Sequence, residues 1–336
     1  MKRHPELFDF EKRMQELSEQ KDPLEKLNFI NWEMFRKHLK KIRKKVPGEA
    51  GRPPFDEILM FKILILQSLY NLSDEQTEYQ IKDRLSFMRF LGLDLHDKVP
   101  DENTIRHFKD KLREHNLIKK LFERFNQFLS KQGLISKQGS IVDASIVDAP
   151  RQRNSEHENE VVKMGNVPKE WKDNPNKLAQ KDTDARWLKY AGRKHFGYKN
   201  HTRVDRKSKL IQDYTVTSAN VHDSKPGAEL IKRAPDKIPI YADRAYDCSK
   251  INEILVDKKM KNKILKKKRK GKVLSQIQKN INRTLSKVRA RVEHVYGDME
   301  KFGGDFVRTI GIERTELRIG LINLVYNFRR SAFLLG

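Results

Sequence analysis

The spacing of apolar residues changes at Gln132-Gly133, from a helical period before this point to extended runs after it. Upstream, Ile105, Phe108 and Leu112 recur every three or four residues, as they do along one face of a helix. Downstream, 140–147 is β-branched and almost wholly apolar, which is typical of a strand buried on both faces. The chain of 336 residues is long enough for two domains that each bury a core. We therefore predict two domains that meet at this point.

The second domain, 133–336, is predicted to have an α/β (α+β) fold in which a mixed sheet is flanked by helices. Its extended runs and helical periods follow one another in the order β, β, β, α, β, α, α, which implies helices packed on a sheet. The polar stretch 151–193 is expected to be a long excursion, which in a compact domain is usually functional or mobile. One long helix is expected from about 275 to 301. The expected strands are 140–147, 195–204, 210–217 and 238–243.

The first domain, 1–132, is predicted to contain helices joined by tight turns. Ser73 and Gln76 have the spacing of a capping box at the start of one helix. A later helix carries Arg106 and Lys109 beside its apolar stripe. This pattern suits a helix-turn-helix-like DNA reader, with Arg106 and Lys109 as candidate DNA contacts. A helical bundle with a merely solvated basic face fits the spacing equally well.

Lysine and arginine outnumber the acidic residues by 71 to 46, which gives a formal net charge of +25. Such an excess favours a nucleic-acid partner, because cationic side chains that bind phosphates release condensed counterions. Ten of the fifteen residues in 258–272 are Lys or Arg and none is acidic. We expect this basic segment to contact DNA backbone, with Lys267 and Arg269 as candidates. The alternatives are a basic solubilising surface or an anionic-membrane binder.

Several classes of protein are excluded by composition. No apolar run approaches the ~20 residues that span a bilayer, and the first residues lack the apolar core of a secretory signal. The single cysteine, Cys248, excludes an internal disulfide and a multi-cysteine zinc site. The sequence also has no Gly-rich phosphate loop, so no nucleotide cofactor is expected. We expect a cytoplasmic protein with no membrane partner.

Three acidic residues are candidates for a functional site. Asp143 lies inside an apolar strand, where an ionised carboxylate costs several kcal/mol unless a cation or a metal compensates it. Asp243 follows a strand at its carboxyl end, which is where open α/β sheets place their ligand sites. Glu293 shares a helix face with Arg289 and Gly297. Taken singly, each of the three acids fits an ion pair, a cap or a turn at least as well.

Six ordered motifs of this chain nevertheless resemble those of the DDE transposases of the insertion sequence five group. The resemblance covers roughly 50–330, because Gly51-Arg52-Pro53-Pro54 and 99–104 also resemble the N-terminal domain of that family. Any one motif would be weak evidence, but the ordered set is specific. The motifs are Val142-Asp143-Ala144-Ser145, Asp182-Thr183-Asp184-Ala185-Arg186-Trp187, Phe196-Gly197-Tyr198-Lys199-Asn200-His201, Ala219-Asn220-Val221-His222-Asp223, Tyr241-Ala242-Asp243-Arg244-Ala245-Tyr246 and Arg289 with Glu293-His294.

The resemblance implies an RNase H-like catalytic core in which Asp143, Asp243 and Glu293 bind two divalent ions. One ion would activate the attacking water or 3′-hydroxyl, and the other would stabilise the leaving 3′-oxygen. Oxygen ligands without clustered His or Cys favour Mg²⁺, with Mn²⁺ as a substitute. We expect the three carboxylates to be both the catalytic residues and the metal ligands.

Candidate DNA contacts surround these carboxylates. Strand alternation places Lys199, His201 and Arg203 on one face, where they would hold phosphates beside the metal site. A plain solvent-exposed face is the alternative. Arg244 and Tyr246, which follow the second carboxylate, are candidates to contact the flanking DNA strand; the alternative is that they pack under the site.

The helix that carries the third carboxylate departs from the pattern of the family. The family has Tyr three residues before Arg289 and Lys seven after Glu293, where this chain has Ser286 and Glu300. Lys301 follows, turned by about 100° around the helix. Arg289 and Lys301 remain candidate DNA contacts, and because the three carboxylates are intact we expect an active enzyme.

The resemblance implies a prokaryotic, nucleoid-associated transposase. Such a protein binds the terminal inverted repeats of its element on double-stranded DNA, cleaves there and joins the ends to target DNA. A homo-oligomer is expected, and a dimer is the simplest arrangement for handling two element ends. The alternatives are an RNase H-type nuclease without strand transfer and a catalytically inactive DNA-binding derivative.

Overall fold

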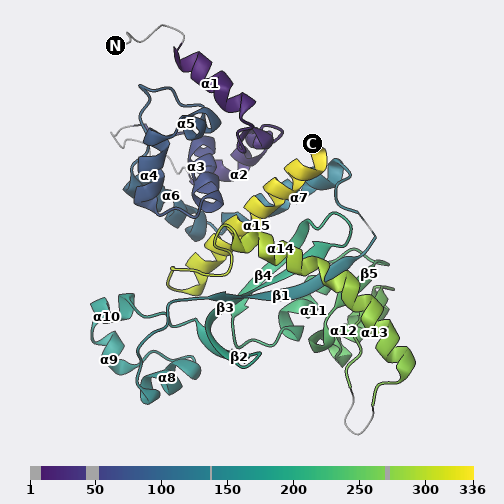
Figure 1. Ribbon diagram of the computed structural model, residues 1–336. Helices are drawn as coiled ribbons and strands as arrows, with labels where there is room; N and C mark the ends of the chain where they lie inside the picture. The colour runs from purple at the N-terminus through teal and green to yellow at the C-terminus, as the bar shows by residue number, and fades with distance from the viewer. Residues whose placement is uncertain (1–8, 43–52, 137, 269–272) are drawn as a thin grey trace. The chain divides into compact units, whose positions relative to one another are not determined.

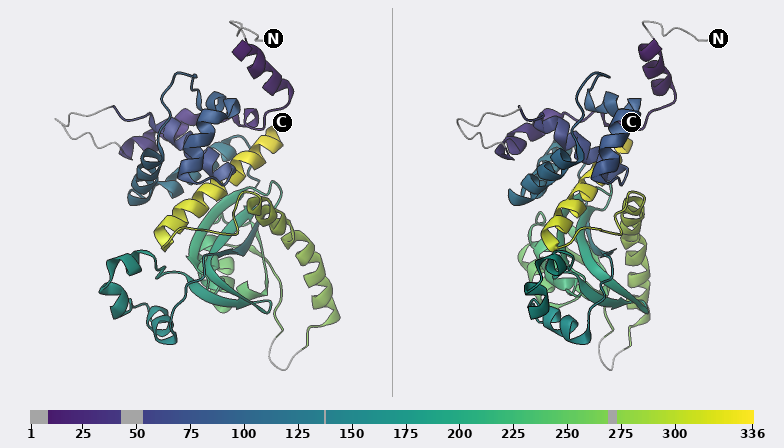
Figure 2. Two further views of the ribbon diagram at one scale, coloured as in Figure 1. Left: turned by 60° about the vertical axis from the view of Figure 1, so that its left-hand side comes forward. Right: turned by 90° about the vertical axis from the view of Figure 1, so that its left-hand side faces the viewer.

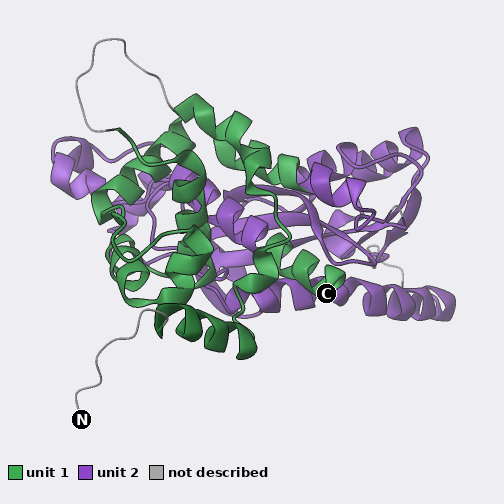
Figure 3. Cartoon of the chain, turned by 90° about the horizontal axis from the view of Figure 1, so that it is seen from above, with its two compact units in different colours: residues 1–125, 327–336 green, residues 126–326 purple. Residues whose placement is uncertain are grey.

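The computed structural model describes residues 9–42, 53–136, 138–268 and 273–336. The chain divides into two compact units, one of residues 1–125 with 327–336 and one of residues 126–326 (Figure 3). The division falls within two helices, α7 (Leu117–Lys131) and α15 (Ile312–Leu335). The change of apolar period predicts a boundary between 132 and 133 instead. None of the described helices is long and apolar enough to cross a membrane.

The first unit is helical throughout its described residues, as the sequence predicts. Helix α3 is buried along most of its length, and Asp56 caps it by accepting hydrogen bonds from the amides of Ile58 and Leu59. Ser73 and Gln76 form the predicted capping box, with both reciprocal hydrogen bonds at 3.1 Å. The helices before α7 are α1 (Asp9–Glu19), α2 (Arg36–Leu39), α3 (Glu57–Leu69), α4 (Asp74–Asp83), α5 (Leu85–Leu91) and α6 (Glu102–Glu114).

An aromatic cluster forms the centre of this unit, and the last ten residues of the chain contribute to it. The ring of Phe328 lies 4.5 Å from that of Phe125 and 5.5 Å from that of Trp32, both in edge-to-face geometry. Phe35 and Phe61 meet edge to face at 5.1 Å. Edge-to-face contacts of this kind stabilise a core beyond the burial of apolar area, so Phe328, near the end of the chain, is part of the core of the first unit.

The second unit is built on a six-stranded mixed sheet (Figures 1 and 2). Five strands follow the order β2-β3-β1-β5-β6. The sixth strand, β4, pairs with 198–204 of β3, whereas β2 pairs with 193–197. The pairs that involve β3 are antiparallel, and β5 runs parallel to both β1 and β6. This is the RNase H-like arrangement that the sequence resemblance implies. The strands are β1 (Ser140–Asp148), β2 (Arg186–Tyr190), β3 (Arg193–Asp205), β4 (Ile211–Ser218), β5 (Pro239–Ala242) and β6 (Lys261–Ile264).

Helices cover both faces of this sheet (Figure 2). On one face, Val142 and Ile240 join a buried apolar cluster with residues of α11 and α12. On the other, the Tyr296 hydroxyl on α14 bonds Thr202 at 2.8 Å, and Asn323 on α15 bonds Asn200. These helices are α11 (Ser224–Lys232), α12 (Ser249–Asp257), α13 (Gln276–Arg289) and α14 (Arg291–Glu300).

Three features of this unit differ from the sequence-based expectation. The single helix expected from about 275 to 301 is two helices, because a tight turn at Ala290, where the Glu293 amide bonds the Ala290 carbonyl, separates α13 from α14. The polar excursion contains three short helices packed on buried Trp171, whose indole N–H donates to Glu158. Strands β2 and β6 were not predicted. The short helices are α8 (Glu156–Lys163), α9 (Lys169–Lys172) and α10 (Pro175–Ala179).

Candidate active site

Two of the predicted carboxylates are adjacent because of strand register. Val142 on β1 pairs with Ala242 on the parallel strand β5. Asp143 is the next residue of β1, and Asp243 is the residue that directly follows β5. The two aspartates therefore lie side by side where the pairing of β1 with β5 ends. The Asp243 carboxylate caps the 3₁₀ turn η4 (Arg244–Tyr246) by accepting a hydrogen bond of 2.8 Å from the Ala245 amide.

The Asp143 carboxylate is largely buried. Only 14% of its side chain is exposed. Burial raises the pKa of Asp143 to about 6, and the negative charge of Asp243 adds to this rise. The guanidinium of Arg289 and the Ala144 amide oppose it. A carboxylate with these surroundings is poorly solvated and gains from a nearby cation.

Arg289 supplies that cation from the end of α13 and bridges two of the carboxylates. Its Nη1 donates to Asp143 Oδ2 at 2.6 Å, and its Nη2 donates to Glu293 Oε1 at 2.9 Å. The second contact joins neighbouring turns at i and i+4, the spacing read from the sequence. The sequence left open whether a cation or a metal compensates Asp143. In this structure the compensating group is Arg289.

The donor chemistry of this site fits a hard divalent cation, but the carboxylates are not gathered around one point. Among the described residues, no three His, Cys, Asp or Glu side chains are grouped closely enough to hold a metal ion. Glu293 is 62% exposed and touches the site through Arg289. Asp143 and Asp243 thus lie side by side, whereas Glu293 contacts Arg289, the partner of Asp143.

The basic row expected on β3 is buried, which corrects its predicted role as a phosphate-binding surface. Alternation does place Lys199, His201 and Arg203 on one face, but that face packs under α11 and their exposures are 7%, 0% and 7%. Lys199 pairs with Asp223 at 2.7 Å, and Arg203 bonds Gln212. Burial lowers the pKa of His201 to about 4, so its ring is neutral at pH 7. Sequence alternation could not show which face the helices cover.

Tyr246 is also buried, as the alternative of packing under the site expects, and its side chain is not placed to contact DNA in this structure. It is fully enclosed in the apolar cluster between β5 and the helices α11 and α12. A Cβ on Gly227 would collide with its ring, so α11 approaches it closely. Its hydroxyl has no hydrogen-bond partner among the described residues. Burial raises its pKa well above the ordinary value.

The other candidate DNA contacts lie at the surface of their own unit. In the second unit, Arg244, Lys267 and Lys301 are exposed, and Lys301 pairs with Asp298 at 2.6 Å. In the first unit, Arg106 is exposed, whereas Lys109 is partly buried and paired with Asp74. Arg269 lies outside the described residues, as do Gly51 and Arg52 of the N-terminal motif.

The motif that begins at Asp182 has a structural role that sequence reasoning missed. The buried Asp182 accepts hydrogen bonds from the Tyr198 hydroxyl at 2.8 and 2.7 Å and from the Gly311 amide at 3.2 Å. Asp184 accepts a hydrogen bond from the Ile312 amide at 2.9 Å, where α15 begins. The pair therefore ties the start of α15 to β3. The close spacing of two acids before a strand was the signal, but their partners at the start of α15 are more than a hundred residues away.

The mixed sheet with two aspartates at the carboxyl side of its parallel strands defines an RNase H-like protein. Family comparison is more specific. Residues 135–328 match the family described as the transposase DDE domain, and residues 12–111 match a second one described as a transposase domain (DUF772). The first match spans more than half of the chain, which therefore belongs to the DDE transposases. These two domains together are the typical architecture of insertion sequence five-like DDE transposases.

Two solved structures are similar to this chain. One is a piggyBac transposase synaptic complex with hairpin DNA, at 12% identity and a TM-score of 0.41, with 91% of this chain and 74% of that chain covered. The other is a Mos1 transposase paired-end complex with the left transposon end, at 10% identity and a TM-score of 0.20, with 65% and 62% covered.

Proposed function

We propose that this transposase binds the terminal inverted repeats of its own insertion sequence, cleaves DNA there and joins the freed ends to target DNA. The observation that carries the proposal is the register that sets Asp143 beside Asp243, with the Arg289–Glu293 pair facing them from α13 and α14. Membership of the DDE family supports phosphodiester hydrolysis and transesterification as the two reactions.

Asp143, Asp243 and Glu293 would hold Mg²⁺, with Mn²⁺ as a substitute. When bound, two such ions supply an activated nucleophile and stabilise the leaving 3′-oxygen. Asp143 contributes a poorly solvated carboxylate whose pKa of about 6 leaves it mostly ionised at neutral pH. The cap from the Ala245 amide fixes the orientation of Asp243. Glu293 stands on the next helix, where a change of rotamer moves its exposed carboxylate.

Arg289 is proposed to have two roles. In the metal-free protein it forms ion pairs with Asp143 and Glu293 through the contacts at 2.6 and 2.9 Å. Once the carboxylates have another cationic partner, its guanidinium is free to hold a DNA phosphate, for which its fork of donors is well suited. The side chain thus protects the site from uncompensated negative charge until DNA and metal arrive.

The proposed partner is double-stranded DNA, bound by a homo-oligomer, most simply a dimer, because two element ends must be handled together. Exposed Arg244, Lys267, Lys301 and Arg106 are proposed to contact DNA backbone. Arg269 stays a prediction from the sequence, and Lys109 would first have to leave Asp74. Such a protein would act in the prokaryotic cytoplasm, on the nucleoid.

The test combines labelled duplex carrying the ends of the element, a target plasmid, purified protein and Mg²⁺. Wild type is compared with Asp243→Asn, which removes one charge but keeps the shape of the side chain. Joined products from wild type alone support the proposal. Cleavage without joining would favour an RNase H-type nuclease, and end-specific binding without either reaction would favour a catalytically inactive DNA-binding derivative.

A further inference from the structure

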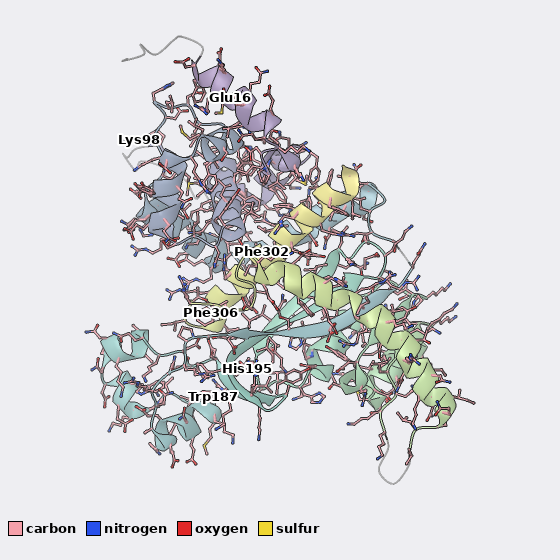
Figure 4. The ribbon with its side chains drawn as sticks, viewed as in Figure 1. Glu16, Lys98, Trp187, His195, Phe302 and Phe306 are labelled. Carbon is pink, nitrogen blue, oxygen red and sulfur yellow. The ribbon has the colours of Figure 1, made fainter. Side chains whose placement is uncertain are left out.

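Strands β2 and β3 form a tight hairpin at the edge of the sheet (Figures 1 and 4). Tyr190 pairs with Arg193, which leaves a two-residue turn in which Ala191 and Gly192 have φ angles of +46° and +79°. Two consecutive left-handed residues are the mark of a type I′ turn, whose twist matches that of the strands. The hairpin is therefore a defined ribbon and not a loose loop.

The hairpin combines exposed aromatic rings with positive charge. Residues 186–195 include Arg186, Lys189, Arg193 and Lys194 and no acid. Trp187 is 43% exposed and Tyr190 is 63% exposed. Lysine is depleted in the centres of protein interfaces, so this composition disfavours a protein partner. Flat rings among cations fit a nucleic acid whose bases are unpaired, because bases stack on the rings while phosphates meet the cations.

The Trp187 ring is held in place before any ligand binds. It packs against Phe196 with ring centroids 5.2 Å apart. The guanidinium of Arg151 lies 5.8 Å from its centroid and donates to the Lys194 carbonyl. On the neighbouring residue of β3, the His195 ring forms a hydrogen bond of 3.1 Å with Asp148 at the end of β1. Fixing a side chain in advance reduces the entropy lost on binding.

Strand register relates Trp187 to the carboxylates. Asp143 pairs with Thr202, and Trp187 pairs with Phe196, six residues earlier on the same strand β3. An even separation puts Asp143 and Trp187 on the same face of the sheet, about 20 Å apart along the strand. Tyr190 is three residues from Trp187 and lies on the opposite face.

We propose that Trp187 is a stacking platform for an unpaired base of the bound DNA end. Lys189 and Lys194 hold the neighbouring phosphates. This inference rests on the proposed function, and it adds the DNA form that the site selects, a duplex end with unpaired bases rather than an intact duplex.

The test measures binding without metal, so that no cleavage occurs. Fluorescence anisotropy compares a blunt duplex of the element end with the same duplex carrying a short single-stranded tail. Trp187→Ala is expected to bind the tailed DNA about tenfold more weakly, and to bind the blunt duplex within about twofold of wild type. Trp187→Phe, which keeps a ring, should recover most of the loss. Tyr190→Ala is the matched control, an exposed aromatic on the other face of the same ribbon, and should bind as wild type does.

A second readout places the base. 2-Aminopurine is placed at each position of the tail in turn, and with wild-type protein its fluorescence should be quenched most strongly at one position. At that position the fluorescence should recover in Trp187→Ala and recover less in Trp187→Phe, which keeps a ring. Equal losses on tailed and blunt DNA, or equal effects of Trp187→Ala and Tyr190→Ala, would overturn the inference. A wild-type protein that joins no ends with Mg²⁺ would instead count against the proposed function.

Discussion

Arg289 Nη1 lies 2.6 Å from Asp143 Oδ2, across a sequence separation of 146 residues. The same guanidinium also holds Glu293, so one arginine pairs with two residues of the expected metal-binding set. We expect this relationship to govern how the site depends on cations and pH.

Removing this arginine should make the protein depend on divalent cations for stability. Arg289→Gln leaves Asp143 without its partner, so we expect a loss of about 2 kcal/mol in unfolding free energy in EDTA. Mg²⁺ should restore more stability to the variant than to wild type, because the carboxylates then lack a competing guanidinium. Thermal unfolding with and without MgCl₂ measures both effects. Lys287→Gln, an exposed charge change on the same helix, should show neither.

Asp143 should make stability fall as pH rises through the weakly acidic range. Its pKa is about 6 in the folded protein against 3.8 for the free side chain, so the folded state binds more protons between these values. Ionisation above pH 6 then costs up to about 3 kcal/mol in the absence of metal. Asp143→Asn should therefore exceed wild type in stability at pH 8 and match it near pH 4, as measured by urea unfolding in EDTA. A variant less stable than wild type at pH 8 would contradict this expectation.

Two glycines should respond in opposite directions to the same substitution. A Cβ at Gly197 would lie 2.9 Å from the Ala149 amide nitrogen and closer still to the Val147 carbonyl, so Gly197→Ala should cost about 1–3 kcal/mol. Gly297 on α14 has no atom within 4 Å of an added Cβ, and alanine there should add up to about 1 kcal/mol. Chemical denaturation of both variants measures these two changes in the free energy of unfolding. Normal DNA binding by Gly297→Ala would show that DNA does not approach this helix face closely at Gly297.

Restoring the family residue at position 300 should strengthen DNA binding. Glu300 is exposed at the end of α14. Glu300→Lys therefore raises the local charge by two, and the new lysine remains in contact with solvent. We expect a few-fold gain in affinity for duplex ends and a salt dependence steeper by about one unit of log–log slope. Titrations at several salt concentrations measure both. Glu253→Lys makes the same charge change on α12, and an equal gain there would show that net charge alone is responsible.

Local rules in the sequence determined much of this protein. The change from helical to extended period, the Ser73 capping box and the sites of Asp143 and Asp243 on their strands all follow from the preferences of short segments. The spacing of Arg289 and Glu293 was likewise enough to predict their contact, because residues four apart on a helix face each other.

Tertiary structure decided which of these residues are accessible and which meet. Alternation correctly grouped Lys199, His201 and Arg203 on one face, but α11 packs on that face, and burial removed them from the surface. Arg289 reaches Asp143 only because α13 crosses the sheet, and the platform at Trp187 exists only because β2 pairs with β3. Period and propensity report the neighbours along the chain, whereas burial and long-range ion pairs depend on how distant elements pack together.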